Sequence, residues 1–253
     1  MARSWLDGSH LSVEAIEALP DFTGFEALLA RPGPWVAGFD FPFTQSQRFL
    51  KGVGWPLDWG PCVDFVARMS RAEFRERLEK YKHHRPFGDK EHQRVFEKGT
   101  GAASPQKLYG VPVGLMFYEG AQRLRRAGVH VPGLCLGDPD RIAVEAYPGV
   151  AARALVGRAS YKSDQRDTAE RLDARKAIVA ALTGQMGRER FGLSVTVPEE
   201  IAMAASGDAL DAAICAVQAA WALRMGFAVQ GMLGLPDPAE GWIADPFVVN
   251  CCL

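Results

Sequence analysis

Two aspartates, Asp208 and Asp211, stand three residues apart in an otherwise apolar segment that extends to about residue 224. Positions i and i+3 share one face of a helix. A helix that is apolar on most sides is expected to be buried, and an isolated buried charge is very costly, so these carboxylates need a cation, a hydrogen bond or a proton. The pair indicates a functional site, although Asp208 could instead complement the helix dipole, with Ser206 as the N-cap.

Two further acidic residues each lie near the end of a short apolar run that is followed by a proline. Residues 35–40 predict a buried strand that ends at Asp40, and residues 141–146 predict a second strand that contains Glu145. Carboxylates at the C-terminal ends of buried strands lie where α/β proteins place their chemistry. We therefore expect these two acids to converge with the aspartate pair of the helix.

Converging carboxylates would do a specific kind of chemistry. They repel one another strongly unless a divalent cation lies between them. Carboxylate oxygens are hard ligands that suit Mg²⁺ or Mn²⁺. In two-metal phosphodiester hydrolysis, one ion activates the attacking water and the other stabilises the leaving oxygen. The sequence thus predicts a metal-binding and catalytic site that uses Mg²⁺ or Mn²⁺, made of Asp40, Glu145, Asp208 and Asp211.

Basic side chains that could hold a phosphate beside these acids come from two positively charged segments. Residues 68–98 contain ten Lys or Arg against six Asp or Glu, and residues 153–176 contain seven against four, whereas the whole chain has a net charge of −1. Such segments could form an anion-binding face. The predicted phosphate-binding residues are Lys162, Arg94, Arg175 and His92.

Each of these residues also has a structural alternative, which the sequence leaves open. Asp40 could accept hydrogen bonds from backbone N–H groups at the strand end, and Glu145 could form an ion pair with Arg94 or Arg153. Lys162 could be an ordinary surface lysine that binds no phosphate. His92 has no second histidine or cysteine at metal-binding spacing.

Elements on both sides of these residues indicate an α/β protein. Residues 3–18 predict a hairpin, residues 44–112 an irregular or helical insertion that covers the sheet, and residues 228–248 a strand or extended tail. The helices expected from the apolar spacing cover residues 21–30, 70–82, 113–126, 148–156, 164–184 and 208–224.

The composition indicates an ordinary cytoplasmic globular protein. Hydrophobic residues make up 48% of the 253-residue chain and charged residues 23%. No apolar run approaches the roughly 20 residues that cross a bilayer, and the first residues lack a signal-peptide pattern, so no membrane partner is expected. The five cysteines form no CxxC pair, which favours a reducing compartment.

Four segments together resemble the DUF429 family, which is predicted to have a ribonuclease H-like fold. They cover residues 35–43, 144–148, 161–164 and 207–212, and the resemblance runs from about residue 35 to residue 243. The Asp-x-x-Asp helix is also similar to the closing helix of Holliday-junction resolvases. The resemblance implies a single ribonuclease H-like domain over residues 1–253, with a mixed sheet flanked by helices. It also implies metal-binding carboxylates at strand ends and a nuclease that acts on DNA or RNA.

The start of the chain differs from that resemblance. Ribonuclease H-like folds open with a strand that carries a metal-binding aspartate, whereas this chain begins at what corresponds to the second strand, and Asp7 falls in the predicted hairpin turn. Either an Asp-bearing strand precedes Met1 or the first ligand has been lost. The unpaired sheet edge that results would allow a homo-oligomer.

Two other functions stay open beside the nuclease. The chain could be a non-catalytic scaffold or regulator with a vestigial acidic pocket. It could also transfer phosphoryl groups on a nucleotide, because sugar kinases and actin-like ATPases share the ribonuclease H-like core. No GxxxxGK[ST] phosphate-binding loop supports this last function.

Overall fold

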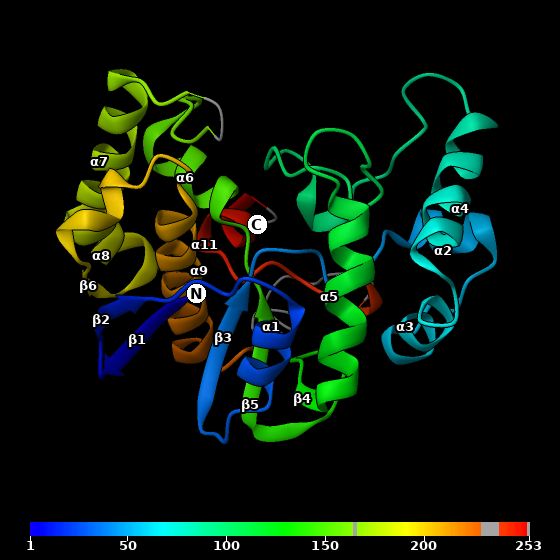
Figure 1. Ribbon diagram of the computed structural model, residues 1–253, viewed down its shortest axis with the longest axis horizontal. Helices are drawn as coiled ribbons and strands as arrows, with labels where there is room; N and C mark the ends of the chain where they lie inside the picture. Colours follow the sequence, from blue (N-terminus) through cyan, green and yellow to red (C-terminus); the bar gives the residue numbers. More distant parts are fainter. Residues whose placement is uncertain (164–165, 229–237, 252–253) are drawn as a thin grey trace.

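A computed structural model describes residues 1–163, 166–228 and 238–251 of the chain. In these residues, six strands form two small sheets (Figure 1). In the hairpin sheet, β1 (Ala2–Asp7) pairs antiparallel with β2 (His10–Ile16), and β2 pairs parallel with the short β6 (Ser194–Thr196). The sheet of residues 1–16 therefore gains its third strand from a distant part of the chain.

The second sheet, which we call the parallel sheet, has the strand order β3-β5-β4. Its central strand β5 (Asp138–Glu145) pairs parallel with β3 (Trp35–Phe39) on one side and with β4 (Val129–His130) on the other. Because β3 and β5 run in the same direction, Asp40 and Glu145 reach the same edge of the sheet.

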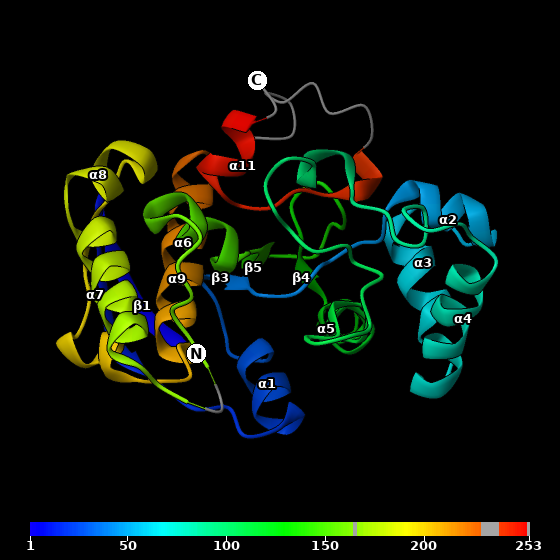
Figure 2. The ribbon, with the colours of Figure 1, turned by 90° about the horizontal axis from the view of Figure 1, so that it is seen from above.

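Helices cover both faces of the parallel sheet, and further helices extend the molecule at each end (Figures 1 and 2). The helices are α1 (Phe22–Leu29), α2 (Gln47–Val53), α3 (Trp59–Val66), α4 (Arg71–His83), α5 (Val113–Ala127), α6 (Pro148–Val156), α7 (Ala169–Thr183), α8 (Gln185–Phe191), α9 (Asp208–Arg224) and α11 (Pro246–Cys251). Short 3₁₀ turns are η1 (Val95–Glu97), η2 (Glu199–Met203) and η3 (Pro238–Glu240).

Helix α9 contacts both sheets, since it packs against β1, β2 and β3. The contact with β3 is close: a Cβ on Gly38 would lie 2.4 Å from the carbonyl oxygen of Cys215. Only glycine allows the strand to approach the helix backbone so closely. This packing brings the end of β3 next to the first turns of α9.

The C-terminal end of β5 is buried between two apolar clusters. Val144 packs into the cluster around α9, whereas Ala143 packs into an aromatic-rich cluster that includes Phe39 and Phe117. A strand buried on both faces reads as a continuous apolar run, which is why residues 141–146 predicted it. The two clusters hold the strand end and the carboxylate of Glu145 in place.

Most of the predicted helices are present in the structure. The sequence could predict them because residues at their ends are typical of helix starts and stops. The side chain of Asp21 accepts a hydrogen bond from the backbone N–H of Gly24 at 2.9 Å, and Ser70 and Glu73 form a reciprocal capping box at α4. Gly128 ends α5 in the left-handed conformation.

The α/β class is confirmed, with differences in detail. The strands lie in two small sheets instead of one mixed sheet, and residues 44–112 contain α2, α3, α4 and η1. The predicted strand or tail at 228–248 is wrong at its end, because residues 246–251 form α11; residues 229–237 lie outside the described residues. None of the described helices has the length and apolar character needed to span a membrane.

Candidate active site

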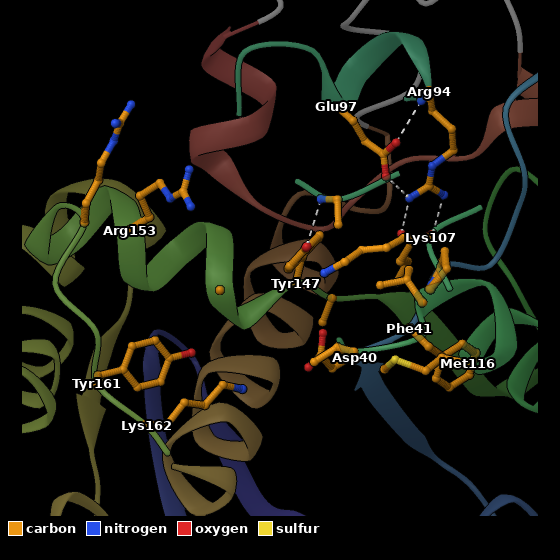
Figure 3. Close-up of a pocket in the computed structure, with 18 of the residues that line it drawn as sticks. Asp40, Phe41, Arg94, Glu97, Lys107, Met116, Tyr147, Arg153, Tyr161 and Lys162 are labelled. Carbon is orange, nitrogen blue, oxygen red and sulfur yellow. Dashed lines mark hydrogen bonds and ion pairs between the residues drawn. The ribbon is translucent and has the colours of Figure 1, made fainter. Parts of the chain in front are cut away.

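A pocket of about 330 Å³ opens at the edge of the parallel sheet where β3 and β5 end (Figure 3). Its walls come from the ends of these strands, from α6, from the start of α5, and from two segments, 94–111 and 157–162. Segments far apart in the sequence thus share one hollow, with Asp40 between the buried Arg94 and Glu97 on one side and Lys162 on the other.

Asp40 has the most perturbed carboxylate of the pocket. Its pKa is raised from 3.8 to about 7, first because the surrounding walls remove water and then because Asp211 and Glu145 add negative charge, while Lys162 opposes the shift. Asp40 is nevertheless an exposed residue, so water still reaches it and the shift comes from the crowded pocket walls around the carboxyl. Within the described residues, no hydrogen bond joins the Asp40 carboxylate to another group.

Asp211 is buried and has two protein partners. The Tyr161 hydroxyl donates to its Oδ1 at 2.7 Å, and the Lys162 ammonium forms an ion pair with its Oδ2. Asp208 is exposed in the first turn of α9, where its backbone N–H donates to Ser206 Oγ at 3.3 Å. Asp211 therefore contacts two pocket-lining residues directly, whereas Asp208 acts on Lys162 only through its charge, which raises the pKa of the lysine.

Glu145 is engaged in a buried ion-pair network. Arg94 Nη1 donates to its Oε2 at 2.7 Å, Arg94 Nη2 pairs with its Oε1, and the backbone N–H of Phe43 donates to Oε2 at 2.8 Å. Arg94 Nη2 also donates to Glu97 Oε1 at 2.7 Å. Burial raises the pKa of Glu145, and the guanidinium of Arg94 lowers it. Of the two alternatives for Glu145, the structure contains the ion pair with Arg94.

Three of the residues predicted to bind phosphate have structural contacts instead. The guanidinium of Arg94 is paired with Glu145 and Glu97, as described above. Arg175 is fully buried and donates to Asp167 and to two backbone carbonyls. His92 is buried, with its Nε2 2.7 Å from the Tyr81 hydroxyl. Arg175 and His92 lie outside the pocket lining, so only Lys162 of the four is placed to meet a phosphate there.

The pocket also holds basic residues that the sequence did not indicate as phosphate ligands. Lys107, Arg153 and Arg158 line it, and no ion pair joins any of them to another residue in the described ranges. Arg153 lies over Gly101, where a Cβ would come 2.1 Å from Nη1. In the sequence, Arg153 and Arg158 were only two of the seven basic residues of segment 153–176, and neither was predicted to bind phosphate. Nothing in the sequence signalled Lys107.

Few side chains at this site could act as metal ligands. No group of three or more His, Cys, Asp or Glu side chains among residues 1–163, 166–228 and 238–251 is placed to hold a metal ion. Asp40 and Asp211 come close enough for the charge of one to raise the pKa of the other. The site therefore has the carboxylate of Asp40 in the pocket wall and that of Asp211 behind it, paired with the pocket-lining Lys162.

Comparison with known proteins identifies the family. The profile of the family described as "protein of unknown function (DUF429)" matches residues 22–240. The chain belongs to the DUF429 family. No curated protein and no solved structure matches the chain. The DUF429 match includes every residue that lines the pocket, together with Asp208 and Asp211.

Proposed function

We propose that this DUF429 protein hydrolyses phosphodiester bonds in DNA or RNA, with the Asp40 pocket as its active site and Mg²⁺ or Mn²⁺ as its cofactor. The observation that carries the proposal is the carboxylate of Asp40 in a pocket whose wall also holds Lys107, Arg153 and Arg158, which have no ion-pair partner in the described residues. Asp211 lies behind that wall, where it contacts the lining residues Tyr161 and Lys162 and raises the pKa of Asp40 by its charge. Carboxylates attract a divalent cation, and the basic side chains attract the phosphate that the cation would activate.

Two carboxylates are sufficient for such an ion. Mg²⁺ commonly keeps several waters and is held by one or two protein carboxylates together with substrate phosphates. Asp40 and Asp211 would hold the ion, and Asp208 would add negative charge from the same helix. When bound, the ion would polarise the phosphoryl group and lower the pKa of a bound water.

The remaining residues would position these groups. Tyr161 holds one oxygen of Asp211, which orients the carboxylate. Lys162 has a side chain that is 44% exposed, so its ammonium can contact a phosphate oxygen as well as Asp211. The Arg94 ion pair holds Glu145 at the end of β5, so in this proposal Glu145 would position the strand end and would not bind the ion. The ribonuclease H-like core stays a prediction.

A cleavage assay on labelled single-stranded and duplex DNA and RNA tests the proposal. We expect cleavage with Mn²⁺ or Mg²⁺ and none with EDTA. Asp211→Asn should slow cleavage by more than the roughly 100-fold that loss of an outer partner of a metal site causes. Asp7→Asn is the matched control, because Asp7 is exposed in the hairpin sheet and does not line the pocket.

Two outcomes would reject the proposal. One is cleavage that persists in EDTA or in a correctly folded Asp211→Asn protein, checked by its circular dichroism spectrum. The other is the absence of cleavage of every substrate with either metal. That second result would favour a scaffold or regulator with a vestigial pocket.

A further inference from the structure

An exposed aromatic ring stands beside the pocket. Tyr109 is 68% exposed and lies in the chain between Lys107 and Val111, which both line the pocket. Lys107, which lines the pocket, has its Nζ 5.2 Å from the centre of the Tyr109 ring. Val111 also lines the pocket and is 59% exposed. Lys107 therefore connects the pocket to the Tyr109 ring.

The size and lining of the pocket limit what it can hold. Its volume of about 330 Å³ is near the lower end of the roughly 300–1,000 Å³ found for small-molecule sites. Phe41, Met116 and Tyr147 provide an apolar and aromatic surface, while Arg153 and Arg158 provide positive charge. An apolar surface beside positive charge matches one base with its phosphate.

We propose that the pocket binds one unpaired nucleotide of a single-stranded nucleic acid and that the neighbouring base stacks on Tyr109. This inference rests on the proposed phosphodiesterase function and adds its substrate class. A nucleotide within a duplex would first have to be unpaired and unstacked, which costs free energy, whereas a single strand presents it directly. Stacking on an aromatic ring tolerates any base, because every base has a π-face.

The basic residues would follow the backbone of that strand. Lys107 lies between the pocket and Tyr109, so its ammonium is placed to contact the phosphate that joins the two nucleotides. Arg153 and Arg158 lie on the α6 side of the pocket and would contact the strand there. Binding of this kind depends on backbone charge and stacking, so it should be sensitive to salt and insensitive to sequence.

Fluorescence anisotropy with a labelled thymidine oligonucleotide, in EDTA to prevent cleavage, tests this inference. The wild-type protein should bind the single strand at least about tenfold more tightly than the same strand annealed to its complement. Tyr109→Ala should weaken single-strand binding about tenfold, and Tyr109→Phe should restore it. Phe87→Ala is the control, since Phe87 is a fully exposed aromatic residue that does not line the pocket.

The inference is overturned if the duplex binds as tightly as the single strand, or if a folded Tyr109→Ala protein binds like the wild type. These results are separate from the cleavage assay. Single-strand binding that depends on Tyr109 without any cleavage would reject the phosphodiesterase proposal alone. Metal-dependent cleavage of duplex and single strand at equal rates, with no effect of Tyr109→Ala, would reject this inference alone.

Discussion

At the scale of single residues, Asp40 couples the ionisation of the pocket to the stability of the fold. Its pKa is about 7 in the folded chain, against the ordinary value of 3.8. Below about pH 4 the carboxyl is protonated in both the folded and the unfolded chain. Between about pH 4 and 7 only the unfolded chain loses the proton, so each rise in pH favours unfolding. Above about pH 7 the folded chain loses the proton as well, so the destabilisation of the fold stays at its full value and no longer changes with pH.

Asp40→Asn should therefore change how stability depends on pH. In EDTA, the unfolding midpoint of the variant should rise relative to that of the wild type between about pH 4 and about pH 8, because asparagine cannot ionise. Thermal unfolding followed by circular dichroism measures this difference. Asp7→Asn should show no such dependence on pH, and an equal midpoint difference for Asp40→Asn at both pH values would contradict the assigned pKa.

The sequence could predict some residues of the site and not others. The end of a buried strand predicted Asp40, and the helical spacing predicted Asp211, because local pattern determines both positions. The sequence could not decide whether Arg94 or Arg153 pairs with Glu145. Arg94 is 51 residues away from Glu145 in the chain, and only the fold brings the two side chains together. Lys107 and Tyr109 belong to no motif: only the folded structure shows that Lys107 lines the pocket and that the Tyr109 ring lies next to it.

At the scale of elements, the contact between β3 and α9 brings the two acids together. Gly38→Ala would place a methyl group 2.4 Å from the carbonyl oxygen of Cys215, and neither backbone can easily move. Overpacking of this kind costs about 1–3 kcal/mol, so we expect a lower free energy of unfolding in urea. The displaced strand should also move Asp40 away from Asp211 and reduce any metal-dependent cleavage.

The matched control is Gly24→Ala in α1. The nearest atoms outside the helix backbone would lie 3.7 Å from a Cβ there, which is an ordinary contact, and alanine favours a helix over glycine. This variant should be as stable as the wild type or slightly more stable. If the two alanine variants unfold at the same urea concentration, the close approach of β3 to α9 does not contribute as described.

Element length decided which parts of the fold were predictable. The hairpin and the longer helices carry enough residues for an apolar period and have capping residues or turn glycines at their ends. The strands β4 and β6 have two and three residues, which is too short for a period. Their places depend on pairing with β5 and β2, which lie far away in the sequence or across a turn.

At the scale of the whole molecule, local charge matters more than net charge. The chain has a net charge of −1, which predicts no attraction for a polyanion. The fold nevertheless gathers Lys107, Arg153, Arg158 and Lys162 around one hollow at the sheet edge. The division of the strands between two sheets could not be predicted from local patterns. Both sheets pack against α9, which comes after all six described strands in the chain.

The most direct test of the metal site is calorimetric titration of Mn²⁺ into the wild-type protein and into Asp40→Asn, above pH 7 so that the Asp40 carboxylate is ionised. Our account predicts saturable Mn²⁺ binding to the wild type and to the Asp7→Asn control, and its loss in Asp40→Asn. Equal binding heats for the wild type and a folded Asp40→Asn protein would contradict it.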